Sequence, residues 1–131
     1  MIVLDTQAWL WWLHDPSRLS VRARKAIVQA EKDDGMVVSA ISVWEVATKS
    51  ALGKLILPLQ IEAWFALART YPGIVIEPVS AEDALASAGL PGEFHKDPAD
   101  RLIVALARRL QVSLVTADGL IRAYPHVVTT W

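Results

Sequence analysis

Five acidic residues lie just after predicted strands or near the starts of predicted helices, where side chains from distant parts of a chain can meet. Asp5 and Asp118 closely follow short apolar runs, Asp97 and Asp100 share one helical first turn, and Glu45 lies in the helix after another apolar run. Carboxylates that converge repel one another unless a cation lies between them. With no cysteine and three histidines, the chain offers mainly oxygen ligands, which suit Mg²⁺ or Mn²⁺.

Each of these acids also has a purely structural explanation. Asp5 and Asp118 stand where a helix needs an N-cap, and Asp is a favoured N-cap residue. Asp97 precedes a proline at the first helical position, which favours capping over metal binding. Glu45 completes a capping box with Ser42, and helical periodicity places it on the surface. For Asp5 and Asp118, capping and metal binding remain equal alternatives.

Asp100 is the acid whose position best fits a binding cleft. The apolar face of its predicted helix is formed by Leu102, Ile103, Leu106 and Leu110. At about 100° per residue, Asp100 falls at the edge of this face, Asp97 points nearly opposite, and Arg101 points outward. An acid at the margin of a packed face is placed to line a cleft.

The elements that must position these acids alternate between strands and helices. Five apolar runs rich in β-branched residues predict strands at Met1–Leu4, Met36–Val38, Ile74–Ile76, Val112–Val115 and Val127–Val128. Helices are predicted at Thr6–His14, Ser20–Asp34, Ser42–Leu52, Gln60–Tyr71, Ala81–Ala88 and Asp97–Leu110. The pattern predicts a three-layer α/β fold with a mostly parallel sheet, whose ligands bind beyond the carboxyl ends of the strands.

Composition limits the class of protein. The 131 residues suit one domain over 1–131, and a hydrophobic content of 53% excludes a disordered chain. No apolar run is long enough to span a bilayer, and no signal peptide is recognisable. We therefore expect a cytoplasmic protein that has no contact with a membrane.

Charge excludes one common mode of nucleic-acid binding. Thirteen Lys and Arg residues against 14 Asp and Glu leave a formal net charge of −1, which argues against a broad cationic face. Binding to nucleic acid would have to be local, or bound metal cations would have to supply positive charge. The sequence also contains neither a Gly-x-Ser-x-Gly motif nor a glycine-rich phosphate loop.

Four segments together resemble the PIN-domain family, and in particular the VapC-type toxin ribonucleases of type II toxin–antitoxin systems. They occur in the family's order and at its spacing: Met1–Thr6, Ser39–Val46, His95–Ala105 and Leu114–Asp118. Each motif is weak by itself, but the ordered set is specific and covers essentially the whole chain.

The resemblance assigns roles that periodicity does not. It implies a catalytic quartet of Asp5, Glu45, Asp100 and Asp118, which overrules the surface interpretation of Glu45. Asp5, Asp100 and Asp118 would be the metal ligands. Thr6, Thr116 and Asp97 would support this site.

The implied activity is Mg²⁺- or Mn²⁺-dependent cleavage of RNA phosphodiester bonds by metal-activated water. The implied partners are the RNA substrate, a cognate VapB-type antitoxin and a second copy in a homodimer. Lys49, Lys96 and Arg101 are candidate contacts to RNA phosphates, with a solvated charged face as the alternative. The rival hypothesis for the whole chain is a catalytically silent PIN-like module that binds RNA or protein.

Tryptophan is abundant, with six residues in the chain. Trp9, Trp11 and Trp12 occupy both sides of the predicted first helix, so they cannot all face one core. Either this helix is buried between the sheet and other helices, or part of its surface contacts the second copy or the antitoxin.

Overall fold

The computed structural model describes residues 1–131 and is built around a five-stranded sheet. The strands are β1 (Ile2–Leu4), β2 (Met36–Ser39), β3 (Ile74–Glu77), β4 (Ser113–Val115) and β5 (Thr129–Thr130). They lie in the order β3-β2-β1-β4-β5, and every neighbouring pair is parallel. The carboxyl ends of all five strands therefore point the same way.

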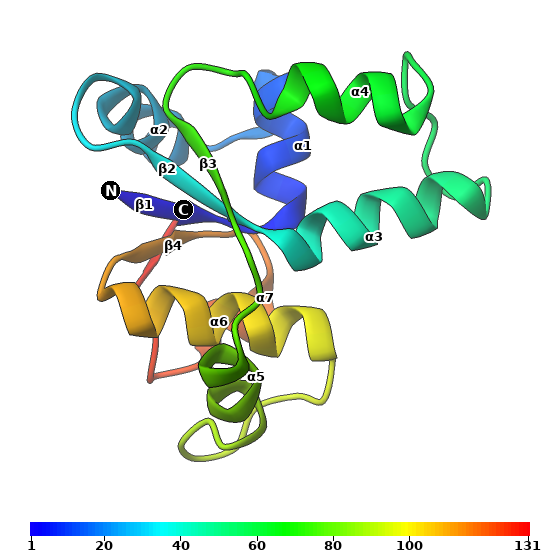
Figure 1. Cartoon of the computed structure of the whole chain (residues 1–131). Helices are drawn as coiled ribbons and strands as arrows, with labels where there is room; N and C mark the ends of the chain where they lie inside the picture. Colours follow the sequence, from blue (N-terminus) through cyan, green and yellow to red (C-terminus); the bar gives the residue numbers. More distant parts are fainter.

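Helices cover both faces of this sheet, which confirms the predicted three-layer α/β/α architecture (Figure 1). In Figure 1, α1, α2 and α4 lie on one side, and α5 and α6 lie on the other. The helical bounds are α1 (Thr6–His14), a 3₁₀ turn (Pro16–Arg18), α2 (Val21–Lys32), α3 (Ala40–Ala51), α4 (Ile61–Ala68), α5 (Ala81–Ala88), α6 (Pro98–Leu110) and α7 (Gly119–Ala123).

Alternating strand residues build two separate cores. Successive side chains of a strand point to opposite faces, so Leu4 joins the core beneath α1, α2 and α4, while Val3 joins the core beneath α6. Val3 lies in register with Val37 and with Leu114, and all three side chains belong to that second core. Burial on both faces explains why the strands read as unbroken apolar runs.

Several predicted boundaries are wrong. The helix predicted to reach Tyr71 ends at Ala68, and helix α7 was not predicted. The differences at α3 and β5 have local reasons. Helix α3 begins at Ala40 because the Ser39 side chain caps it, accepting the Ile41 N–H at 3.1 Å. Ser42 therefore lies inside the helix, and the capping box with Glu45 does not exist.

The last strand also lies two residues later than predicted. Pairing with β4 begins where the backbone N–H of Leu114 donates to the carbonyl of Val128, and it continues from Thr116 to Thr130. Val128 itself is 70% exposed. The apolar run thus precedes the strand.

The first helix is buried between the sheet and neighbouring helices. Trp9 is fully buried, and Trp11 and Trp12 are half-buried against the same core. This arrangement favours the packing explanation for these three tryptophans. No helix combines the length and apolarity that crossing a bilayer requires.

Candidate active site

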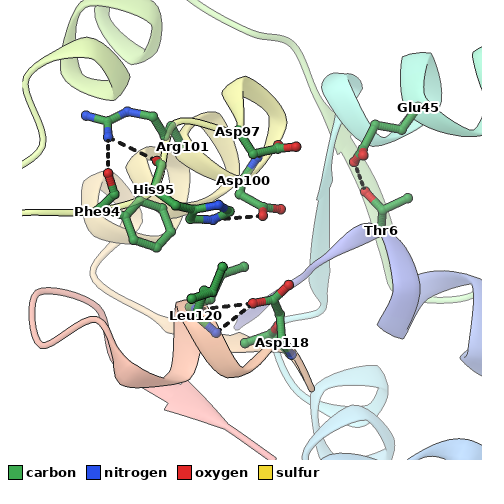
Figure 2. A network of polar contacts seen from close by, with 11 residues as sticks. Thr6, Glu45, Phe94, His95, Asp97, Asp100, Arg101, Asp118 and Leu120 are labelled. Carbon is green, nitrogen blue, oxygen red and sulfur yellow. Dashed lines mark hydrogen bonds and ion pairs between the residues drawn. The ribbon is translucent and has the colours of Figure 1, made fainter.

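The five acids identified in the sequence line one pocket at the carboxyl edge of the sheet. Its volume is about 400 Å³, and it is lined by Asp5, Thr6, Gln7, Leu10, Trp11, Glu45, Lys49, Asp97, Asp100, Ala117 and Asp118. The acids come from the ends of β1 and β4 and the first halves of α3 and α6. Figure 2 shows Asp97, Asp100 and Asp118 on one side of this space and Glu45 with Thr6 across from them.

Asp5 and Asp118 cap helices and face the pocket as well. Oδ1 of Asp5 accepts the N–H of Ala8 at 2.8 Å, at the start of α1. Oδ1 of Asp118 accepts the N–H groups of Leu120 and Ile121 at the start of α7. Capping uses one oxygen of each side chain and fixes its orientation. In Asp118 both capping contacts use Oδ1, which leaves Oδ2 for another ligand. The two explanations offered by the sequence are thus compatible.

Asp97 and Asp100 are joined through the first turn of α6. Oδ1 of Asp97 accepts the backbone N–H of Asp100 at 2.9 Å, as expected of an N-cap before a proline. This cap sets the path of the chain at Asp100, whose side chain is 22% exposed at the pocket.

Glu45 is held by a chain of hydroxyl groups. The Thr6 hydroxyl lies 2.5 Å from Oε1 of Glu45 and 2.7 Å from the hydroxyl of Ser42, which is fully buried. A carboxylate only accepts hydrogen bonds and a hydroxyl has one proton. Thr6 therefore donates its single proton to Glu45, and the Ser42 hydroxyl lies beside the Thr6 oxygen. Glu45 is turned toward α1 instead of solvent, so the surface interpretation from periodicity is wrong.

His95 contributes to the site from the loop before α6. Its Nε2 lies 3.0 Å from Oδ2 of Asp100, as Figure 2 shows, although the contact lacks the alignment of a hydrogen bond. A protonated imidazole at this distance would partly balance the charge of Asp100.

Burial and mutual repulsion raise the pKa of two carboxyl groups. Burial raises the pKa of Asp5 to about 6 against the opposing hydrogen bonds of Thr116 and Ala8, and the charges of Asp118 and Glu45 add to the rise. Burial also raises the pKa of Asp100 to about 7, and the charge of Asp97 is the next largest cause. The pocket therefore holds more negative charge than its own side chains balance.

This donor set suits a hard divalent cation. The acidic ligands are all oxygen atoms, and the raised pKa values of Asp5 and Asp100 mark a place where a positive charge would be stabilised. No three acidic or histidine side chains are close enough together to form a ready-made metal site. Two of the acids have their own partners in this structure, Thr6 at Glu45 and His95 at Asp100.

The three basic candidates have different surroundings. Lys49 lines the acidic pocket, one helical turn after Glu45. Lys96 is exposed and does not line it. Arg101 does not point outward, because its guanidinium donates to the backbone carbonyls of Ser87, Ala88, Phe94 and His95 at 2.8–3.4 Å. Arg101 thus ties the 89–97 loop to α6, which leaves it little capacity to bind a phosphate.

Thr116 supports the site from beneath. It is fully buried, and its hydroxyl accepts the backbone N–H of Asp118 at 3.0 Å. Ser42 is a further supporting residue that sequence reasoning missed, because its hydroxyl was assigned to a cap. His95 lies in the loop before α6, and no local pattern in the sequence indicates its contact with Asp100.

Comparison with known proteins agrees with this geometry. Residues 2–127 match the family model described as PIN domain. The chain is 37% identical to Ribonuclease VapC22 of Mycobacterium tuberculosis, over 99% of this chain and 98% of that protein.

Solved structures share the fold at lower identity. VapBC2 from Rickettsia felis, solved bound to a DNA fragment from its promoter, matches with a TM-score of 0.71 and 16% identity, covering 98% of this chain and 97% of that one. Mycobacterium tuberculosis VapC20, a Sarcin-Ricin loop cleaving toxin, matches with a TM-score of 0.61 and 18% identity over 98% and 99% of the two chains. At these identities the likeness shows the fold alone.

Proposed function

Because this chain belongs to the PIN-domain family, we propose that it is a Mg²⁺- or Mn²⁺-dependent endoribonuclease and the toxin of a VapBC-type toxin–antitoxin module. PIN-domain ribonucleases depend on metal ions in general. The observation that carries the proposal is the shared pocket, in which acids from both ends of the sequence lie together without a balancing set of cations. Capping alone would not require these carboxylates to meet.

Asp5, Asp100 and Asp118 would hold the metal. When bound, such an ion lowers the pKa of a water molecule and neutralises charge that develops on the phosphoryl oxygens. The chain contributes fixed carboxylates: the Ala8 N–H restrains Asp5, and the first turn of α7 restrains Asp118. Asp97 restrains the backbone at Asp100.

We assign Glu45 to orient the attacking water and to accept a proton from it. Its carboxylate lies across the pocket from Asp100, and the Thr6 hydroxyl holds one of its oxygens. The other oxygen can accept a proton from the water as that water attacks the phosphorus and the 3′ oxygen leaves. Lys49 is the pocket's one lysine, and we assign it to a flanking phosphate.

The proposed partners are RNA, a cognate VapB-type antitoxin and a second copy of the chain. The ribonuclease relative at 37% identity supports RNA as the substrate class. An antitoxin segment lying across the acidic pocket would keep RNA away from Asp100 and Glu45. This partnership predicts that expression of the chain alone arrests growth, and that Asp100→Asn abolishes the arrest.

The direct test is cleavage of total RNA by purified protein in Mg²⁺ and in EDTA, with the cut ends mapped by sequencing. Wild type should cut in Mg²⁺ and not in EDTA, and Asp100→Asn should not cut in either. Glu82→Gln, which removes an exposed acid from the first turn of α5, is the matched control and should cut like wild type. Equal cleavage by Asp100→Asn would refute the proposal.

The alternative is a catalytically silent module that binds RNA or protein. It predicts no cleavage and no Mn²⁺ binding that depends on Asp100. Calorimetric titration of Mn²⁺ into wild type and Asp100→Asn separates the two hypotheses. The nuclease hypothesis requires wild type to bind Mn²⁺ more tightly than Asp100→Asn, and the silent-module hypothesis does not.

A further inference from the structure

Trp44 differs from the other tryptophans of the chain. The other five each pack against another aromatic ring, in the pairs Trp9–Trp64, Trp11–Trp131 and Trp12–Tyr71. Trp44 has no aromatic partner and is 60% exposed. A single exposed apolar side chain needs no special explanation, so its place in the molecule decides its meaning.

That place is a groove beside the acidic pocket. The groove has a volume of about 350 Å³ and is lined by Ile41, Trp44, Glu45, Asp97, Pro98 and Ala99. It lies between the first halves of α3 and α6. Glu45 and Asp97 belong to both the groove and the acidic pocket. A ligand at the acidic pocket can therefore extend into the groove without a gap.

We propose that Trp44 stacks against an unpaired base of the RNA whose neighbouring phosphate lies at the acidic pocket. This inference rests on the proposed ribonuclease function and names a subsite for it. Single-stranded RNA is commonly held by bases that stack on aromatic side chains. The apolar walls formed by Ile41 and Pro98 suit the face and edge of a neutral base.

The charge of the molecule favours such a contact. The net charge is −1, Lys49 is the one basic side chain lining the acidic pocket, and the Arg101 guanidinium is occupied by backbone carbonyls. Phosphate contacts alone therefore provide little affinity. Stacking involves no charge, so it can hold RNA beside the carboxylates that repel its backbone.

The same charges disfavour a second copy of the chain as the occupant. A two-fold interface centred on Trp44 would bring the Glu45 and Asp97 carboxylates of both copies toward each other. Like charges facing across an interface oppose association. A neutral base meets no such repulsion.

The test measures binding by fluorescence anisotropy in EDTA, which blocks cleavage. The probes are a labelled adenylate decamer and an abasic ribose-phosphate decamer of equal charge. Wild type should bind the adenylate decamer about 5- to 150-fold more tightly than the abasic one. Trp44→Ala should lose this preference without weakening abasic binding, and Trp44→Phe should keep most of it. Leu85→Ala removes another exposed apolar side chain, on α5, and should behave like wild type.

Three outcomes would overturn the inference. One is an equal preference in wild type and Trp44→Ala, and another is an equal loss in Leu85→Ala. The third is a change of molar mass by light scattering in Trp44→Ala, which would make the groove an interface between copies. Cleavage of total RNA in Mg²⁺ is measured on the same preparations. Protein that cuts RNA but shows no preference for bases refutes the stacking and leaves the nuclease proposal standing.

Discussion

The Thr6 hydroxyl donates to Oε1 of Glu45 at 2.5 Å and joins the first residue of α1 to α3 across 39 positions of sequence. Both residues line the acidic pocket, and the fully buried Ser42 completes the chain of hydroxyl groups. The contact decides which way Glu45 faces.

Removing the Thr6 hydroxyl should therefore slow cleavage while the fold survives. Thr6→Val keeps the shape of the side chain but frees Glu45, and we expect kcat to fall about 10- to 100-fold, the usual effect of losing a group that orients an active-site ligand. Thr6→Ser should restore most of the rate. Initial rates on an RNA substrate check this, and wild-type kcat in Thr6→Val would show that Glu45 needs no such support.

The free energy of unfolding should depend on pH in metal-free protein. The pKa values of Asp5 and Asp100 are raised to about 6 and about 7 from 3.8. The native state thus holds protons that the unfolded chain has lost. Stability is then unaffected below about pH 4 and falls as pH rises to about 7. Above that range, ionisation of Asp5 alone should lower the free energy of unfolding by about 3 kcal/mol.

Urea unfolding in EDTA at about pH 5 and about pH 8 measures this effect. Asp5→Asn should flatten the profile, since the amide carries no charge at either pH. A wild-type protein that gained stability between these two pH values would contradict the assignment.

Divalent cations should stabilise the fold through the same carboxylates. Mn²⁺ or Mg²⁺ should raise Tm at about pH 8 and much less at about pH 5, because protons then compete for Asp5 and Asp100. Asp100→Asn should be more stable than wild type in EDTA and should lose most of its response to metal. Thermal scans with and without EDTA report both effects, and an undiminished shift in Asp100→Asn would place the metal elsewhere.

Replacing Arg101 should weaken the fold and leave the electrostatics of RNA binding unchanged. Its guanidinium holds carbonyls at the end of α5 and within the 89–97 loop, so Arg101→Ala should cost roughly 2–4 kcal/mol of unfolding free energy. Urea denaturation checks the loss, and limited proteolysis should show faster cutting within the loop. A variant as stable as wild type would show that these contacts contribute nothing.

Lys49→Ala should have the opposite effects to Arg101→Ala: it should keep the stability of the fold and weaken RNA binding. We expect nearly native stability, weaker RNA binding and a salt dependence of log Kd reduced by about one in slope, as for the loss of one phosphate contact. Lys96→Ala is the matched control, because this exposed lysine lies outside the pocket. Equal salt-dependence slopes of log Kd for the two variants would show that Lys49 does not contact an RNA phosphate.

Local patterns were sufficient for most of the elements, but not for helix α7, the start of α3 or the position of β5. Parallel strands buried on both faces leave unbroken apolar runs, and Asp97 before a proline identifies the start of α6, where its side chain caps the Asp100 N–H. The placement of Asp5 and Asp118 just after strands was also readable. In a parallel sheet, residues at that position necessarily meet at one edge.

The environments of single side chains were decided only by tertiary structure. Helical periodicity gives the angle of a side chain around its own axis, but it does not say which second element lies at that angle. Periodicity therefore places Glu45 on the surface, although α1 brings the Thr6 hydroxyl against it. Trp44, the residue before Glu45 in α3, is 60% exposed although it is apolar. Arg101 binds carbonyls of a loop whose path depends on how α5 packs against α6, a contact that no spacing along the chain encodes.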